Sequence, residues 1–200
     1  MATRTESRSD TTEPIDLLEP KEAAKRLVDA QCAAAAVVKP VAPLLSEAAK
    51  LMADAISSGG RIFFCGAGSS GLMAMADALE LPGTYGIDPE QVVTLLAGGR
   101  DNLHYLAGIV EDNETGGYSE LTDMAPSARD CVIVVSASGA TPYALGVARA
   151  ASASFSALIR ASICAVRQSP AKPSTMAATL TAATARLRAT HLHSSTSGPV

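Results

Sequence analysis

A strand, a glycine-rich loop and a helical pattern follow one another without a break between Arg61 and Thr84. The sequence there reads RIFFCGAGSSGLMAMADALELPGT. Its first residues form a short apolar run of the kind seen in parallel strands that are buried on both faces. The loop Gly66–Gly71 then leads into the helix, and such a junction gathers backbone N–H groups, hydroxyls and a helix dipole around an anion. The segment therefore predicts an anion site at the end of a buried strand.

The same alternation of strands and helices continues along the chain. It is typical of an α/β fold, with a parallel sheet and helices on both of its faces. Ligands of such sheets bind at the carboxyl ends of the strands, where the glycine-rich loops lie here. Two helical patterns come first, at about residues 20–39 and 43–58. We then predict strands at Ile62–Cys65, Val92–Leu96, Cys131–Val135 and Ala161–Val166, and helices at Ser70–Leu79, Leu103–Asp112 and Thr141–Ala151.

Composition and length narrow the class of protein. The chain of 200 residues suits one domain, and its net charge of −4 argues against a nucleic-acid-binding surface. The polar N-terminus lacks the apolar core of a signal peptide, and no uninterrupted apolar stretch reaches membrane-spanning length. We therefore expect a cytoplasmic protein that binds neither nucleic acid nor membrane. Four widely spaced cysteines predict buried reduced thiols and no metal site; they are Cys32, Cys65, Cys131 and Cys164.

Charge is unevenly distributed along the sequence. All 20 acidic residues lie at or before Asp130, whereas the rest of the chain has six basic residues and no acid. Residues 171–200 are rich in Ala, Thr and Ser, with weak periodicity. This segment fits either a low-complexity tail or an altered or truncated reading frame, and both interpretations stay open.

The glycine spacing in Gly66–Gly71 also matches a dinucleotide-binding loop. That interpretation requires an acid at the end of the second strand, about 20 residues further on, to bind a ribose. Asp88 and Glu90 instead precede that strand. Two serines at the tip of the loop, Ser69 and Ser70, are better suited to donating hydroxyls to a small phosphate, which favours a phosphate over a nucleotide.

A second hydroxyl-rich loop follows another buried strand, Cys131–Val135. It reads SASGATP over residues 136–142, and Thr141 is predicted to cap the next helix with Pro142 at its first position. Two such helix entrances after two parallel strands favour a sugar phosphate held between them. Two ordinary capped turns are the alternative.

Several segments of the sequence resemble the N-acetylmuramic acid 6-phosphate etherases, whose sugar-binding unit is a sugar isomerase (SIS) domain. The resemblance covers about residues 5–150 and implies an SIS-type three-layer fold, in which two N-terminal helices precede a parallel sheet flanked by helices. It divides the chain into a polar N-terminal tail (1–19), an SIS sugar-phosphate-binding domain (20–166) and an atypical C-terminal tail (167–200). The segments that carry it are Thr5–Arg8, Gly66–Gly71, Asp77–Gly86, Leu96–Gly99 and Ser136–Tyr143.

The resemblance also implies a reaction. Members of the family are lyases that cleave the lactyl ether of N-acetylmuramic acid 6-phosphate, giving N-acetylglucosamine 6-phosphate and D-lactate. Two carboxyl groups in different environments can supply the acid and the base without metal or cofactor. The resemblance places the acid at Glu80 and the base at Glu111, with Glu114 as the alternative to Glu111. At a helix end beside apolar neighbours, Glu80 would be partly desolvated, which favours its protonated form.

The same resemblance assigns the sugar phosphate to the two loops and implies a homodimer. His104 is expected to be a surface or packing residue, and Arg100 a solvated surface residue. The expected binding residues are Gly68, Ser69, Ser70, Ser136, Ser138, Gly139 and Thr141.

Three function classes remain open on the sequence. They are the etherase, an aldose–ketose phosphosugar isomerase of the same fold, and a non-catalytic sugar-phosphate sensor. Etherases continue with a further basic, Gly-Ser-Thr-Arg-like segment that has no counterpart in residues 151–200. We therefore expect weak or no etherase activity from this form of the chain.

Overall fold

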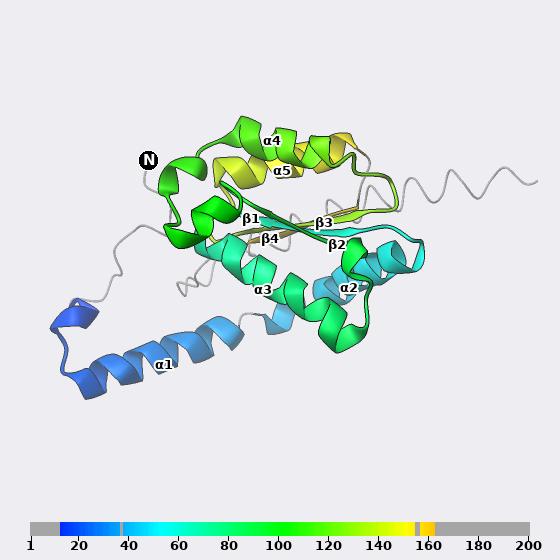
Figure 1. Ribbon diagram of the computed structural model, residues 1–200. Coiled ribbons are helices and arrows are strands. Elements are labelled where there is room, and N and C mark those ends of the chain that lie inside the picture. The colour runs from blue at the N-terminus through cyan, green and yellow to red at the C-terminus, as the bar shows by residue number, and fades with distance from the viewer. Residues whose placement is uncertain (1–12, 37, 155–156, 163–200) are drawn as a thin grey trace, which may run out of the picture.

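The structure is a computed structural model that describes residues 13–36, 38–154 and 157–162. Its centre is a parallel sheet of four strands in the order β2-β1-β3-β4 (Figure 1). The strands are β1 (Ile62–Gly66), β2 (Val92–Leu96), β3 (Cys131–Ser136) and β4 (Ala157–Ser162). All five residues of β1 are buried, as its continuous apolar run predicts for a central strand covered on both faces.

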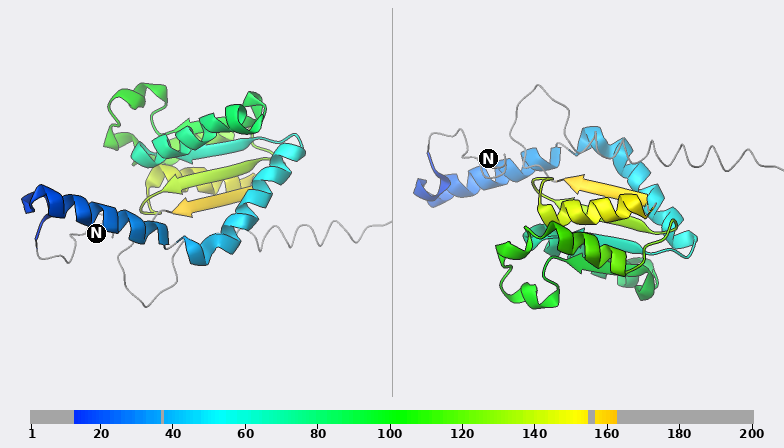
Figure 2. Two further views of the ribbon diagram at one scale, coloured as in Figure 1. Left: turned by 90° about the horizontal axis from the view of Figure 1, so that it is seen from below. Right: turned by 90° about the horizontal axis from the view of Figure 1, so that it is seen from above.

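Two helices cover each face of the sheet. Figures 1 and 2 show α2 (Ala42–Ser57) and α3 (Gly68–Tyr85) on one face, and α4 (Glu114–Asp123) with α5 (Pro142–Ala153) on the other. Because side chains alternate along a strand, β1 contributes to both cores. Phe63 joins the core beneath α4 and α5, and Phe64 joins the core beneath α2 and α3. The α/β class and the three-layer arrangement are confirmed.

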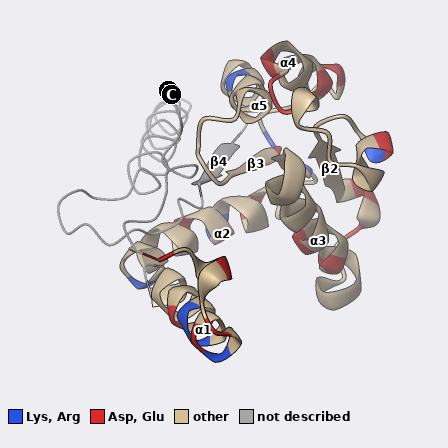
Figure 3. Ribbon diagram, turned by 90° about the vertical axis from the view of Figure 1, so that its left-hand side faces the viewer, with Lys and Arg blue, Asp and Glu red and all other residues tan. Residues whose placement is uncertain are grey.

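Helix α1 (Pro20–Ala36) extends to the side of this body and buries none of its residues (Figures 1 and 2). Leu27 and Val28 are 55% and 60% exposed. Figure 3 shows both signs of charge on α1, where Lys25 and Asp29 form an exposed ion pair of 3.0 Å. By length and composition alone, the stretch Pro20–Ser57 is long and apolar enough to cross a membrane, and it comprises α1 and α2.

Helix positions differ from the prediction at two places. The predicted helix at Leu103–Asp112 is wrong, because that stretch forms two 3-10 turns, Arg100–His104 and Gly108–Val110. The α-helix begins later, at Glu114, where Asn113 Oδ1 accepts a hydrogen bond of 2.8 Å from the N–H of Gly116. An N-terminal cap of this kind satisfies a donor that the helix leaves unpaired.

The predicted helix at Ser70–Leu79 is too short at both ends. Helix α3 begins at Gly68 and continues through Pro82 to Tyr85. It ends at Gly86, which adopts the left-handed conformation with φ of 67° and donates to the carbonyl of Pro82. A left-handed glycine is a common helix stop.

The last strand also starts earlier than predicted. Instead of Ala161–Val166, β4 is Ala157–Ser162, and the remainder of the prediction lies outside the described residues, as does the C-terminal tail.

Cys65 and Cys131 are buried and free, as expected, whereas Cys32 is exposed on α1, so the prediction fails there. Burial, together with the neighbouring charge of Asp130, raises the pKa of Cys131 to about 12. Cys164 lies outside the described residues.

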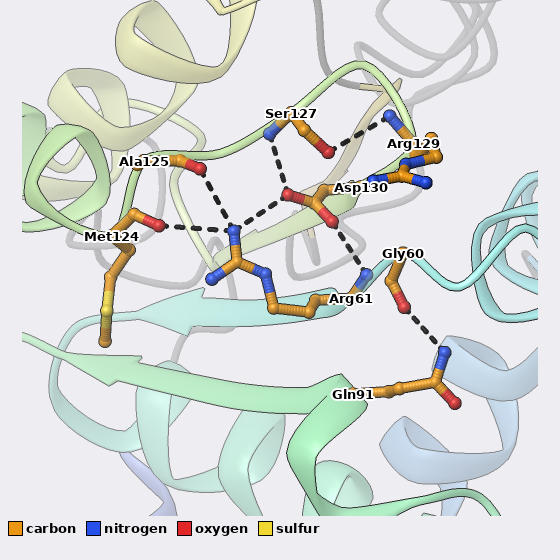
Figure 4. A network of polar contacts seen from close by, with 8 residues as sticks. All are labelled: Gly60, Arg61, Gln91, Met124, Ala125, Ser127, Arg129 and Asp130. Atoms are coloured by element: carbon orange, nitrogen blue, oxygen red, sulfur yellow. Dashed lines mark hydrogen bonds and ion pairs between the residues drawn. The ribbon is translucent and has the colours of Figure 1, made fainter.

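At the amino ends of the strands, Asp130 joins β3 to the start of β1 (Figure 4). Its carboxylate, which is 2% exposed, accepts hydrogen bonds from the Arg61 N–H at 2.7 Å, the Arg61 guanidinium at 3.0 Å and the Ser127 N–H at 2.7 Å. Burial alone would raise the pKa of Asp130, but these bonds outweigh it and lower that pKa. This network is structural, because it lies at the edge of the sheet opposite to the ligand-binding end.

Candidate functional site

The strand order places the two glycine- and serine-rich loops side by side. From β1 the chain crosses to β2 on one side, and from β3 it crosses to β4 on the other side. Gly66 at the end of β1 lies opposite Val135 near the end of β3. In open parallel sheets, the point where two neighbouring strands lead off in opposite directions is where ligands bind. The predicted sites thus share one edge of the sheet.

The first loop is a tight turn between β1 and α3. Any side chain on Gly71 would collide with Leu96, and a Cβ atom on Gly66 would come within 2.8 Å of the Gly71 Cα. These two glycines therefore serve close packing of the helix against the strand. Because α3 begins at Gly68, Ser69 and Ser70 lie in its first turn, where helix N–H groups have no partner within the helix.

Gly68 holds the loop against a carboxylate. It has a φ of 52°, a conformation that favours glycine, and it is buried. A Cβ atom at this position would collide with Glu111 Oε1. The half-buried side chain of Glu111 therefore lies directly against the first loop.

Glu111 is tied to the second loop through its main chain. Its carbonyl accepts a hydrogen bond of 2.9 Å from the N–H of Tyr143, in the first turn of α5. Its own N–H donates to the carbonyl of Gly108 at 2.9 Å. Glu111 thus lies between the beginnings of α3 and α5, the two helices that follow the loops. The alternative, Glu114, instead forms an ion pair with Arg149 of α5.

Hydroxyl groups close the second loop on itself. Ser136, which is 5% exposed, shares a hydrogen bond of 2.9 Å with the Thr141 hydroxyl and accepts another of 3.1 Å from the Gly139 N–H. Ser138 Oγ accepts from the Ala140 N–H at 3.1 Å. Thr141 is the N-terminal cap residue of α5 with Pro142 at its first position, as predicted, but its side chain makes no hydrogen bond to the helix N–H groups.

Glu80 lies away from this loop edge. It is in the interior of α3 and exposed, so the prediction of a partly desolvated residue at a helix end is wrong. Twelve residues separate Glu80 from Gly68, which corresponds to about 18 Å along the helix axis. One chain therefore brings Glu111, but not Glu80, to the two loops.

Two further residues, a histidine and an arginine, lie at the surface as expected. His104 and Arg100 are exposed. Asp88 accepts a hydrogen bond of 2.9 Å from the Glu90 N–H in a short turn before β2, so neither acid stands where a ribose-binding acid would. Within residues 13–36, 38–154 and 157–162, no three His, Cys, Asp or Glu side chains are grouped so that they could hold a metal ion.

Asn102 shapes the loop that carries Glu111, and sequence reasoning missed it. Its side chain is buried, donates to the Ala97 carbonyl at 3.0 Å and accepts from the Ala107 N–H at 2.7 Å. An asparagine soon after two glycines indicates a turn, but the burial of its side chain and its bonds to residues five positions away on either side have no sequence signal.

Comparison with known proteins agrees with this fold. The SIS domain family profile matches residues 29–159. The chain is 34% identical over 174 residues to an N-acetylmuramic acid 6-phosphate etherase of Photorhabdus laumondii, covering 87% of this chain and 56% of that protein. It is 35% identical over 145 residues to the protein of that name from Bacillus subtilis, covering 72% of this chain and 48% of that protein. The chain thus spans about half the length of the curated relatives it matches.

Solved structures of the same fold include two phosphoheptose isomerases. The one from Neisseria gonorrhoeae has a TM-score of 0.51 at 15% identity, covering 84% of this chain and 98% of that chain. The one from Francisella tularensis has a TM-score of 0.54 at 18% identity, covering 72% of this chain and 75% of that chain. At these identities the likeness concerns the fold alone.

Proposed function

Because this chain belongs to the SIS domain family, we propose that it binds a sugar phosphate and, as a carbon–oxygen lyase, cleaves the D-lactyl ether of N-acetylmuramic acid 6-phosphate. The products would be N-acetylglucosamine 6-phosphate and D-lactate, formed in the cytoplasm during recycling of cell-wall amino sugars. The similarity to etherases supports this choice of reaction.

One observation carries the proposal. The Glu111 carboxylate lies against Gly68, between two hydroxyl-bearing loops at the carboxyl edge of a parallel sheet. We propose that the phosphate binds at the loops, with Ser69 and Ser70 on one side. The second loop supplies the other contacts, from Ser136, Ser138, Gly139 and Thr141.

In the proposed reaction, Glu111 acts as the base. It would take the proton from C2 of the sugar, and the electron pair left behind would form a C2–C3 double bond as the C3–O bond breaks. An acid must then give a proton to the departing ether oxygen, and water adds across the double bond. General acids and bases of this kind contribute about 10²- to 10⁴-fold each.

We propose that the acid is Glu80 of a second copy of the chain. Acid and base groups that act on one sugar in glycosidases lie about 5–10 Å apart, which the separation of about 18 Å along α3 does not allow within one chain. Glu80 is exposed and shares α3 with Met73 and Leu79, which are 59% and 71% exposed. Covering these apolar side chains with a partner would stabilise a homodimer and desolvate the proton donor.

Product analysis tests the proposal. The chain is incubated with N-acetylmuramic acid 6-phosphate, D-lactate is measured enzymatically, and a set of hexose phosphates is assayed in parallel. We expect D-lactate release that is weak, as the sequence predicts for this form of the chain, and that Glu111→Gln abolishes. Interconversion of an aldose and a ketose phosphate without lactate would favour an isomerase, and sugar-phosphate binding without turnover of any substrate would favour a sensor.

A further inference from the structure

We infer that Tyr143, held through its hydroxyl by Glu120, is a positioning residue that fixes Glu111 between the two loops. The positioning itself is independent of the reaction, whereas its effect on catalysis rests on the proposed function. Nothing in the sequence distinguishes Tyr143 from an ordinary core residue.

Tyr143 is the largest fully buried side chain among the described residues, at 1% exposed. Its hydroxyl donates a hydrogen bond of 2.5 Å to Glu120 Oε2 on α4. Burial, followed by this hydrogen bond, raises the pKa of Tyr143 well above its usual range, so the phenol stays protonated and remains the donor. Cys65 of β1 is a further titratable group that interacts with this pair, and its own burial raises its pKa and keeps it a neutral thiol.

The main chain of the same residue reaches the candidate base. Pro142 is the first residue of α5 and has no N–H, so the first N–H of that helix belongs to Tyr143. This N–H donates to the Glu111 carbonyl at 2.9 Å. Tyr143 therefore binds α4 with its side chain and the Glu111 loop with its backbone.

Two glycines make this arrangement rigid. A side chain on Gly117 of α4 would collide with the Tyr143 carbonyl, and a side chain on Gly146 of α5 would collide with the Glu114 carbonyl. The backbones of α4 and α5 are therefore in direct contact on both sides of the tyrosine. Because the helix backbones pack this closely and the Tyr143 N–H is bonded to the Glu111 carbonyl, we expect a shift of Tyr143 to displace Glu111 as well.

A phenylalanine would fill the same space without requiring a carboxylate beside it. Placing the carboxylate of Glu120 next to a core residue is unfavourable unless it is hydrogen-bonded. An apolar ring would already fill this space, so what the hydroxyl and the carboxylate add is a hydrogen bond that fixes the orientation of the ring relative to α4. This is the reason to assign the pair a role in positioning beyond core packing.

The experiment compares Tyr143→Phe with Tyr118→Phe, a matched change at an exposed tyrosine of α4. Amide hydrogen exchange is followed residue by residue, because local opening accelerates it where a contact is lost. We expect Tyr143→Phe to accelerate exchange at the amides of residues 111 and 143 while those of β1 and β3 stay protected. Tyr118→Phe should change neither set. Unchanged exchange at 111 and 143, or a uniform increase throughout the core, would overturn the inference.

Turnover supplies the second readout. Misplacing a catalytic group by about 1 Å can cost roughly 100-fold, so Tyr143→Phe should lower kcat by roughly 10- to 100-fold and leave KM nearly unchanged. Glu120→Gln, whose amide oxygen can accept the same hydrogen bond, should retain kcat, whereas Glu120→Leu should lose it. A kcat for Tyr143→Phe equal to that for Tyr118→Phe would contradict the catalytic part of the inference. If the unmodified chain releases no D-lactate, the proposed function fails, and the exchange measurement still decides the positioning.

Discussion

Gly68 has a left-handed backbone conformation and leaves room for the carboxylate of Glu111, the proposed base. Its φ of 52° puts a strain on any other residue, and the space next to its Cα is filled by the Glu111 carboxylate. Gly86 offers a matched comparison, because its φ is 67° but no atom lies within 4 Å of where its Cβ would be. The two glycines therefore separate the cost of strain from the cost of displacing the carboxylate.

We predict that Gly68→Ala and Gly86→Ala each lose about 1 kcal/mol of unfolding free energy through the left-handed backbone. Only Gly68→Ala should also lose most D-lactate release, because its methyl group pushes Glu111 aside. Urea unfolding and the lactate assay, applied to both variants, check this. Equal activity in the two variants would show that the position of Glu111 does not matter.

Asp130 makes stability depend on pH. Its folded-state pKa is below the unfolded value, so the stabilisation is complete above that unfolded value, near pH 4, and is lost as the pH falls through the folded pKa. Asp130→Asn should lower the unfolding free energy by about 1–3 kcal/mol at pH 7, since a buried charged hydrogen-bond partner is removed. Urea unfolding at pH 7 and near pH 3 should show the difference from wild type shrinking in acid. A difference that stays constant would mean that Asp130 does not titrate with folding.

At the scale of elements, the hydrophobic pattern of the sequence predicted the strands that are short, continuous apolar runs. The strand at Val92–Leu96 was predicted with its observed bounds, and the buried strand at residue 62 began where expected. Tertiary contacts decided the rest. The helical pattern at Leu103–Asp112 gave way to short turns around the buried Asn102, and Pro82 did not end α3.

The candidate site, like the fold, was predicted in part. Both loops came to one edge of the sheet, with Glu111 beside them, because strand order brings the ends of parallel strands together. The depth of Glu80 along α3 was not predicted, since it depends on where the helix begins and ends. The hydrogen bonds between Thr141 and Ser136 and between Tyr143 and Glu120 were not predicted either. They depend on how the side chains are oriented in the folded chain, which the spacing of residues in the sequence does not show.

The start of α4 can be tested by itself. Asn113→Ala removes the side-chain acceptor for the Gly116 N–H and should lower the unfolding free energy by about 1 kcal/mol, whereas Asn113→Asp keeps an acceptor and should cost little. Chemical denaturation of the two variants measures this. Because Glu111 is only two residues away, amide exchange at 111 should also rise in Asn113→Ala alone. Equal stabilities would show that another group starts the helix.

At the scale of the molecule, two helices of a single chain expose apolar side chains. Helix α1 buries none of its residues, and α3, which carries Glu80, exposes Met73 and Leu79. These exposed apolar side chains fit the proposed dimer, in which a second copy would cover them. A second copy covering the exposed side chains of α3 would carry Glu80 to a site that holds only Glu111.

Mixing two inactive variants tests this account most directly. Glu80→Gln and Glu111→Gln are purified separately, combined under conditions that let subunits exchange, and assayed for D-lactate release from N-acetylmuramic acid 6-phosphate. In a mixed dimer, one site receives an intact Glu111 from one copy and an intact Glu80 from the other. We predict no release from either variant alone and recovery of about one quarter of the unmodified chain's rate in an equal mixture, as random pairing in a two-fold dimer requires. Release by Glu111→Gln alone, or no recovery in a mixture shown to contain mixed dimers, would contradict it.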